Sequence, residues 1–292
     1  MNNRISQQPR RLLFLWASLL SISLANVAIP IFAHGSSIRY LANEGVMVSS
    51  TQGKVLFDPF FHNDFGQYQK VPEAIRNQLF NQLPPFDGID FIVISHAHED
   101  HFSPEDVLRY LTLNKRCRLV APQQAVAILK LEPSFNLVAD RVVSVNLQKG
   151  QVAFEQRIGA VDFSAVRIPH AGWPGRADIE NLIVRVQLGD SSVMHFGDAD
   201  PAMMHFIEQK PFFARKELDL ALPPYWFLTR ESGINILNEI IKPSQIIGIH
   251  VPVTVPVLLS QSTYDFFSRP GELRLIINKN DNQSVKNNPK KN

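Results

Sequence analysis

Three histidines and an aspartate, all side chains of the types that bind divalent metals, fall within six consecutive positions. Residues 96–101 read His-Ala-His-Glu-Asp-His. Neutral imidazoles and a carboxylate are the ligands that zinc and similar ions select. The segment directly follows the apolar run 90–95, which is typical of a strand buried on both faces. A loop at this place lets the side chains diverge around two metal ions, so the sequence predicts a metal centre built from His96, His98, Asp100 and His101.

Three further residues of these types follow later apolar runs, where a strand is expected to end. They are His170, Asp198 and His250. A single histidine is more often packed or exposed than bound to metal. His170 and His250, however, would complete a ligand set for which residues 96–101 alone supply too few side chains. For the acid, Asp198 competes with Asp200, and we favour Asp198 because it directly follows Gly197 at the expected strand end.

Short apolar runs between turn residues predict the elements that position these side chains. Strands are expected at 38–41, 46–49, 55–57, 90–95, 118–120, 142–145, 152–154, 160–167, 182–188, 192–196, 218–222 and 245–249. Helices are expected at 72–80, 123–130, 201–209 and 234–241, and one begins at Ser103, an N-cap residue followed by Pro104. This order fits two packed sheets with helices outside.

These features resemble the metallo-β-lactamase superfamily in five signatures that occur in order between residues 38 and 252. They are Asp58 after an early strand, the 96–101 loop, His170, the Gly197-Asp198 pair, and His250. The resemblance implies an α/β fold, a four-layer αβ/βα sandwich in which helices flank two mixed β-sheets. It also places the metals at one edge of the two sheets.

The resemblance further implies a role for each residue. The first metal is expected between His96, His98 and His170, and the second between Asp100, His101 and His250. Asp198 would bridge both metals, and Asp58 would fix the loop by hydrogen bonds. The expected cofactors are two divalent ions, with zinc favoured over manganese or iron.

This ligand set implies metal-dependent hydrolysis. A bound metal lowers the pKa of water from about 16 toward about 7, and either Asp100 or Asp198 can accept a proton. True metallo-β-lactamases generally lack a bridging aspartate, so Asp198 argues against β-lactam hydrolysis. Oxygen-reducing di-iron members usually carry glutamate in place of His98. A mononuclear iron dioxygenase and a non-catalytic metal-binding protein remain the alternatives.

The substrate is less well determined. Residues 41–45, 58–61 and 95–101 are similar to the branch that contains phosphorylated-sugar lactonases and N-acyl phosphatidylethanolamine phospholipases. The resemblance therefore implies a phosphodiester or a lactone ester, carried by a small molecule or a lipid-like substrate, with peripheral membrane contact as an option. Candidate substrate contacts are His62, Trp173, Tyr225 and Trp226. Ordinary core packing is an equally good interpretation of the three aromatic residues.

The N-terminus predicts export. A basic segment, the apolar run 12–24 and Ile-Phe-Ala at 31–33 are typical of a signal peptide; a retained membrane anchor is the alternative. Residues 1–33 contain three of the 29 basic residues and none of the 27 acidic residues, so a formal charge of −1 remains after their removal. The basic excess thus gives no argument for nucleic acid. We expect a periplasmic or secreted hydrolase domain over 34–277 and a polar, disordered tail over 278–292.

Cys117 is the only cysteine. It therefore cannot form an internal disulfide or a thiolate-rich zinc site. A single cysteine also says little about the redox compartment of the protein.

Overall fold

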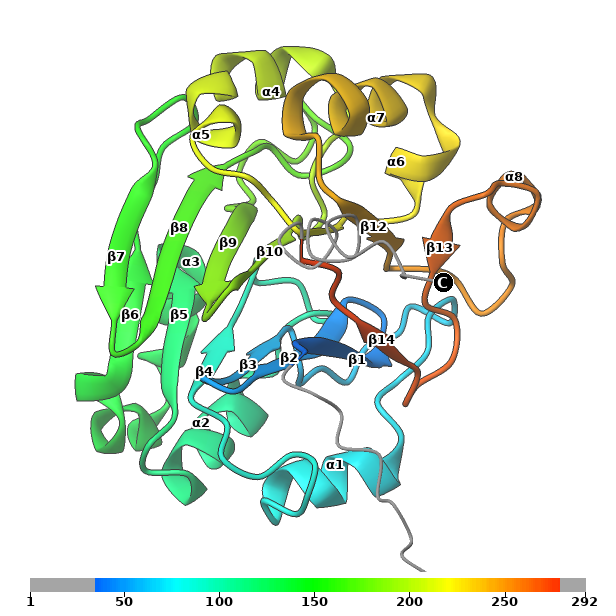
Figure 1. Cartoon of the computed structure of the whole chain (residues 1–292). Coiled ribbons are helices and arrows are strands. Elements are labelled where there is room, and N and C mark those ends of the chain that lie inside the picture. Colours follow the sequence, from blue (N-terminus) through cyan, green and yellow to red (C-terminus); the bar gives the residue numbers. More distant parts are fainter. Residues whose placement is uncertain (1–34, 279–292) are drawn as a thin grey trace, which may run out of the picture. The chain divides into compact units, whose positions relative to one another are not determined.

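The computed structural model describes residues 35–278, which form two seven-stranded sheets packed face to face (Figure 1). The first sheet has the order β14 (Leu273–Leu275), β1 (Ser37–Ala42), β2 (Gly45–Ser50), β3 (Gly53–Phe57), β4 (Phe91–Val93), β5 (Arg118–Pro122) and β6 (Val142–Val145). The second has the order β13 (Asp265–Phe266), β12 (Gln245–Gly248), β11 (Leu220–Leu222), β10 (Ser191–His195), β9 (Leu182–Leu188), β8 (Val161–Arg167) and β7 (Phe154–Ile158).

Both sheets are mixed. In the first, β14 and β1–β3 pair antiparallel, and β3–β6 pair parallel. In the second, β7–β10 pair antiparallel, and β10–β13 pair parallel. The apolar side chains of the two inner faces form one buried cluster, to which Phe57, Phe163 and Val193 belong.

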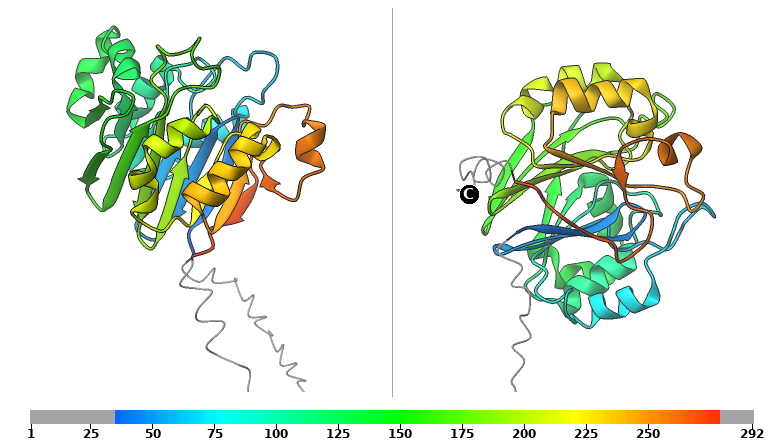
Figure 2. Two further views of the ribbon diagram at one scale, coloured as in Figure 1. Left: turned by 90° about the horizontal axis from the view of Figure 1, so that it is seen from above. Right: turned by 45° about the vertical axis from the view of Figure 1, so that its right-hand side comes forward.

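Helices cover the outer face of each sheet (Figure 2). On the first lie α1 (Glu73–Phe80), α2 (Pro104–Leu113) and α3 (Gln123–Leu129), with the 3-10 turns Pro133–Leu137 and Ala139–Arg141. On the second lie α4 (Met203–Glu208), α5 (Lys210–Ala214), α6 (Trp226–Thr229), α7 (Glu231–Asn235) and a π-helical turn, Ile236–Ile241; α8 (Val257–Ser260) lies in the loop after β12. The expected four-layer sandwich is confirmed.

Most strands and helices lie where the sequence predicts them, and α2 begins as expected. The Ser103 hydroxyl accepts a hydrogen bond from the Asp106 amide at 3.4 Å. The strand expected at 152–154 is wrong in extent: β7 spans Phe154–Ile158, because its polar residues pair in register with β8. Five further elements are not predicted from the sequence, and each has five residues or fewer. They are β13, β14, α5, α6 and α8.

The two terminal predictions fall almost entirely outside the described residues. The predicted signal peptide lies wholly beyond them, as do residues 279–292 of the predicted tail. Asn278 is described, and its side-chain oxygen accepts a hydrogen bond from the Ser191 hydroxyl at 2.9 Å. Between residues 35 and 278, no helix is long and apolar enough to cross a membrane.

Candidate metal centre

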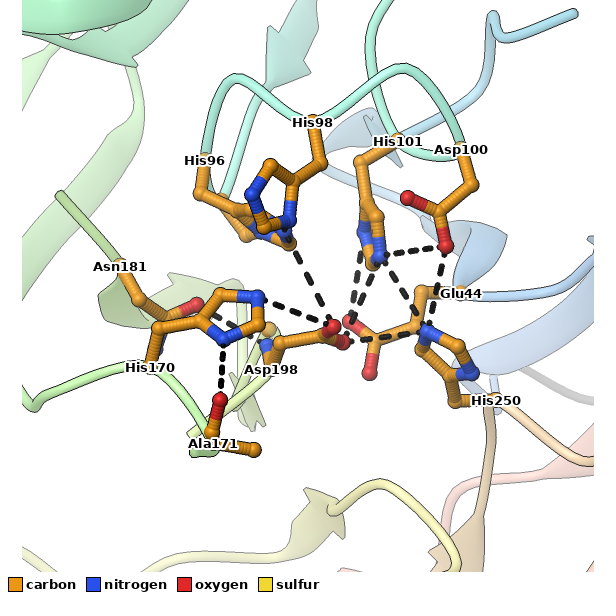
Figure 3. A network of polar contacts seen from close by, with 12 residues as sticks. Glu44, His96, His98, Asp100, His101, His170, Ala171, Asn181, Asp198 and His250 are labelled. Carbon is orange, nitrogen blue, oxygen red and sulfur yellow. Dashed lines mark hydrogen bonds and ion pairs between the residues drawn. The ribbon is translucent and has the colours of Figure 1, made fainter. Parts of the chain in front are cut away.

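The structure brings all seven predicted ligand residues together at one edge of the two sheets (Figure 3). Each follows the carboxyl end of a strand: the 96–101 loop comes after β4, His170 after β8, Asp198 after β10 and His250 after β12. β8 and β10 run in the same direction because both are antiparallel to β9. Side chains from separate parts of the chain therefore converge at this edge, and only His98 is more than marginally exposed.

Three histidines lie on one side of Asp198. His96 Nε2 lies 3.1 Å from His98 Nδ1, and His170 Nε2 lies 3.2 Å from Asp198 Oδ2. The His170 Nδ1 proton is donated to the Ala171 carbonyl at 2.8 Å, which leaves Nε2 facing Asp198 with a lone pair. This group has the donor atoms of a three-histidine metal site with one carboxylate oxygen.

A second group lies on the other side of Asp198. His101 Nε2 lies 3.3 Å from His250 Nε2, and each of these atoms lies 3.5 Å from Asp100 Oδ2. Asp198 Oδ1 lies 3.4 Å from the first nitrogen and 3.1 Å from the second. Tetrahedral ligands with metal bonds of about 2.1 Å are about 3.4 Å apart. The two histidine nitrogens and Asp100 Oδ2 therefore have the mutual spacing of three ligands of one metal ion.

Asp198 faces both groups because its two oxygens diverge. Oδ1 points to His101 and His250, and Oδ2 points to His170 (Figure 3). His170 Nε2 and Asp198 Oδ1 are buried and have no hydrogen-bond partner among the described residues, as expected of lone pairs directed at a cation. Asp200 lies outside the group, where it accepts hydrogen bonds from the amides of Ala202 and Gly172.

The charges of the second group favour a cation between its side chains. Burial lowers the pKa of His250, but Asp198 and Asp100 outweigh this effect and raise it to about 10. Burial likewise opposes charge on His101, but Asp100 and Asp198 raise its pKa well above the ordinary value. A divalent ion would supply this positive charge and displace the protons. In the first group, burial lowers the pKa of His96, which leaves that imidazole neutral for metal binding.

Asp58, which follows β3, orients a side chain of the second group through hydrogen bonds. Its carboxylate accepts hydrogen bonds from the Ser95 amide at 2.8 Å and from the Ser95 hydroxyl at 2.5 Å. It also accepts the His101 Nδ1 proton at 2.9 Å, which directs Nε2 toward Asp198. Asp58 and His250 both have left-handed backbone angles, with φ of 40° and 57°, and the surrounding contacts must hold these strained positions.

Replacing Asp58 with asparagine is expected to lower metal affinity by about 10–100-fold, because the partner that orients His101 loses its charge. Competition with a chromophoric chelator measures this affinity. Asp219→Asn is the matched control, since Asp219 accepts hydrogen bonds from the Ser192 amide and hydroxyl in the same way, outside the metal centre. Equal affinity in the two variants would contradict the orienting role of Asp58.

Glu44 is a buried acid beneath the centre that the sequence analysis did not single out. Neither of its carboxylate oxygens has a hydrogen-bond partner among residues 35–278. The nearest donors are His195 Nε2 at 3.6 Å and His101 Nδ1 at 3.8 Å. Both give their protons elsewhere, to the Glu44 carbonyl and to Asp58. Burial therefore raises the pKa of the Glu44 carboxyl well above its ordinary value.

Glu44→Gln is expected to stabilise the chelator-treated protein progressively as pH rises. The pKa of Glu44 is higher in the folded protein than in the unfolded chain, where it is 4.5. The contribution of Glu44 to the unfolding free energy is therefore fully present below pH 4.5 and is lost as pH rises toward the folded-state pKa. The difference in unfolding free energy between variant and wild type should therefore grow above pH 4.5, by at most about 1.4 kcal/mol per pH unit. Urea unfolding from pH 4 to 8 measures it; a constant difference would contradict the prediction.

A cavity of about 500 Å³ opens over the two groups. This size suits a small-molecule ligand. Its walls include His98, Asp100, Asp198, His250, Phe65, Tyr68, Arg176 and Ile179. Burial and the nearby Asp198 raise the pKa of Tyr68 above the ordinary range, so its hydroxyl keeps its proton.

None of the four predicted substrate contacts lines this cavity. His62 faces a separate depression, where its Nε2 lies 3.0 Å from the Asp106 carboxylate. Trp173 turns toward His205, with ring centroids 5.7 Å apart. Tyr225 packs against Trp226, with centroids 5.5 Å apart.

Trp226 contacts the centre from its buried side. Its ring centroid lies 5.3 Å from that of His250, and its indole N–H donates to the Ala199 carbonyl at 3.0 Å. Trp226 therefore supports a predicted ligand and does not face the cavity. The aromatic wall comes instead from Phe65 and Tyr68.

Other functional positions were missed because their sequence signals are weak. The Asn43 side-chain amide donates to the Asp100 backbone carbonyl at 2.9 Å. The Asn43 backbone carbonyl accepts from the His250 backbone amide, also at 2.9 Å. The Asn181 side-chain oxygen accepts a hydrogen bond from the Asp198 backbone amide at 2.9 Å. Asn43 lies in a tight turn between two apolar strands and within residues 41–45, one of the segments that resemble a branch of the superfamily, whereas Asn181 only precedes a strand.

Comparisons with known proteins agree with this geometry. The sequence model of the family described as "Beta-lactamase superfamily domain" matches residues 54–231, more than half of the 292-residue chain. A segment covering 31% of the chain is 31% identical over 99 residues to protein YddR of Bacillus subtilis (strain 168). The match spans 37% of YddR, so the chain covers well under two thirds of that relative's length.

Solved structures share the fold at low sequence identity. The protein Igni18 of Ignicoccus hospitalis, described as a novel metallo hydrolase, superposes with a TM-score of 0.56 over 84% of the chain and 99% of its own length, at 14% identity. A variant of the β-hydroxylase CmlA of Streptomyces venezuelae superposes with a TM-score of 0.54 over 82% of the chain and 54% of its own length, also at 14% identity. These similarities concern the fold alone.

Proposed function

Because the chain belongs to the metallo-β-lactamase superfamily, we propose that it is a metal-dependent hydrolase with a dinuclear centre that acts on a phosphodiester or a lactone ester. The observation that carries the proposal is the orientation of the Asp198 carboxylate, whose oxygens face two separate sets of ligand-type atoms. A single-metal site would need only one of these sets.

Each side chain then has a defined task. His96, His98 and His170 would hold the first ion, Asp100, His101 and His250 would hold the second, and Asp198 would bridge them. When bound, divalent ions lower the pKa of a water molecule and stabilise negative charge on the attacked group. Zinc is the favoured metal, because both ligand sets consist of imidazole nitrogens and carboxylate oxygens.

Asp100 is the better candidate to accept a proton from the attacking water. Both oxygens of Asp198 face histidines, whereas Asp100 Oδ1 has no hydrogen-bond partner and Asp100 lines the cavity. Asp100 would hold this proton only transiently before passing it to the leaving group, because a metal ion bound to Asp100 would favour its charged form.

Elemental analysis of the purified protein, followed by a substrate panel, tests the proposal. We expect two equivalents of zinc or manganese, and hydrolysis of either bis(p-nitrophenyl) phosphate or a lactone series. One iron per chain with oxygen consumption would favour the dioxygenase alternative. Metal binding without turnover of any substrate would favour a non-catalytic metal-binding protein. Failure to bind metal after reconstitution would overturn the proposal.

We also propose that the chain acts outside the cytoplasm on a small-molecule or lipid-like substrate. The basic and apolar pattern of residues 1–33 supports export. Fractionation of cells that express the full chain, with intact mass measurement, tests it. We expect a periplasmic or secreted product that lacks residues 1–33, or a membrane-bound product that retains them. A full-length product in the cytoplasm would overturn it.

A further inference from the structure

Tyr68 has the position of a substrate-binding group, although no sequence signature marks it. Its ring lies edge-on to the His250 ring, with centroids 4.2 Å apart and an interplanar angle of 85°. It lines the same cavity as His98 and Asp198. No side-chain hydrogen bond of Tyr68 occurs among residues 35–278, so its hydroxyl is free to bind a ligand.

The surrounding backbone fixes the Tyr68 ring without help from the hydroxyl. The Tyr68 amide donates to the Asp64 carbonyl at 3.0 Å, which closes a turn. The Gln67 carbonyl accepts from the Val253 amide at 2.8 Å, and the Gln69 side chain donates to the Ser268 carbonyl at 2.5 Å. These bonds tie the segment to the loops after β12 and β13. The ring is thus held over His250 while the hydroxyl makes no structural contact.

We propose that the Tyr68 hydroxyl is a catalytic group that donates a hydrogen bond to an oxygen of the phosphoryl or ester group held over Asp198 and His250. This inference rests on the proposed hydrolase function. Hydrolysis places negative charge on the oxygens of the attacked group, and a donor already fixed in position stabilises that charge at little reorganisation cost. The hydroxyl proton stays on Tyr68 throughout, so no covalent step involves this residue.

The test uses Tyr68→Phe, which removes the oxygen and keeps the ring on His250. Tyr225→Phe is the matched control, because Tyr225 lies nearby against Trp226 but does not line the cavity. Metal content and thermal midpoint should be unchanged in both variants. We expect Tyr68→Phe to weaken binding of inorganic phosphate to the metal-loaded protein by about tenfold, and to lower kcat by about 10²-fold with a smaller change in KM.

Phosphate affinity and kcat together separate this inference from the proposed function. If the metal-loaded wild type hydrolyses no substrate, the proposed function fails, and phosphate titration alone then decides whether Tyr68 binds an oxyanion. If the wild type is active and Tyr68→Phe matches Tyr225→Phe in both phosphate affinity and kcat, the role of Tyr68 is overturned. A selective loss of phosphate affinity and kcat in Tyr68→Phe supports it.

Discussion

Replacing Asp198 with asparagine is expected to reduce bound metal from two equivalents to at most one and to lower turnover by about 10³-fold or more. The carboxylate presents Oδ1 to one set of histidines and Oδ2 to the other. An asparagine amide offers one oxygen and one NH2 group, so it can face only one set with a lone pair. It also removes a negative charge that offsets the charge of two divalent ions. Elemental analysis and steady-state kinetics measure both effects.

Asp200→Asn is the matched control for this prediction. Asp200 is two residues further along the same loop, but its oxygens accept backbone amides and do not face the histidines. We expect the control to bind two metal equivalents and to turn over within a few-fold of wild type. If the Asp198 variant retained two metals and near-native turnover, the bridging role would be rejected.

The sequence predicted the ligand residues because their positions depend on local rules. A polar residue within three positions after a buried apolar strand lies at the sheet edge, and Asp58, His170, Asp198 and His250 all follow this pattern. Parallel or co-directed strands then bring these ends together. The layer order was predictable for the same reason, since alternating apolar runs specify which faces are buried.

Apart from Asp58, the residues that orient the ligands were not predictable, because their partners are distant in sequence. The Asn43 side chain bonds to Asp100, and Asn181 bonds to Asp198, contacts that exist only once the two sheets are packed. The cavity walls depend on loop directions that no periodicity encodes. Trp173 directly follows the His170 loop yet turns away to His205, whereas Tyr68, remote from every signature, reaches His250.

Substitution of Gly197 by alanine is expected to destabilise the protein by about 2–5 kcal/mol and to displace Asp198. Gly197 has φ of 52°, and an added Cβ would lie 2.3 Å from Asn181 Oδ1 and 2.8 Å from Ser95 Cβ. Since Asn181 Oδ1 holds the Asp198 amide, metal content should fall as well.

Gly159→Ala isolates the backbone strain, because Gly159 has φ of 61° but no atom within 4 Å of an added Cβ. The control should lose only about 1 kcal/mol and keep its metal. Equal unfolding free energies and equal metal content in the two variants would show that close packing at Gly197 does not position the bridging carboxylate.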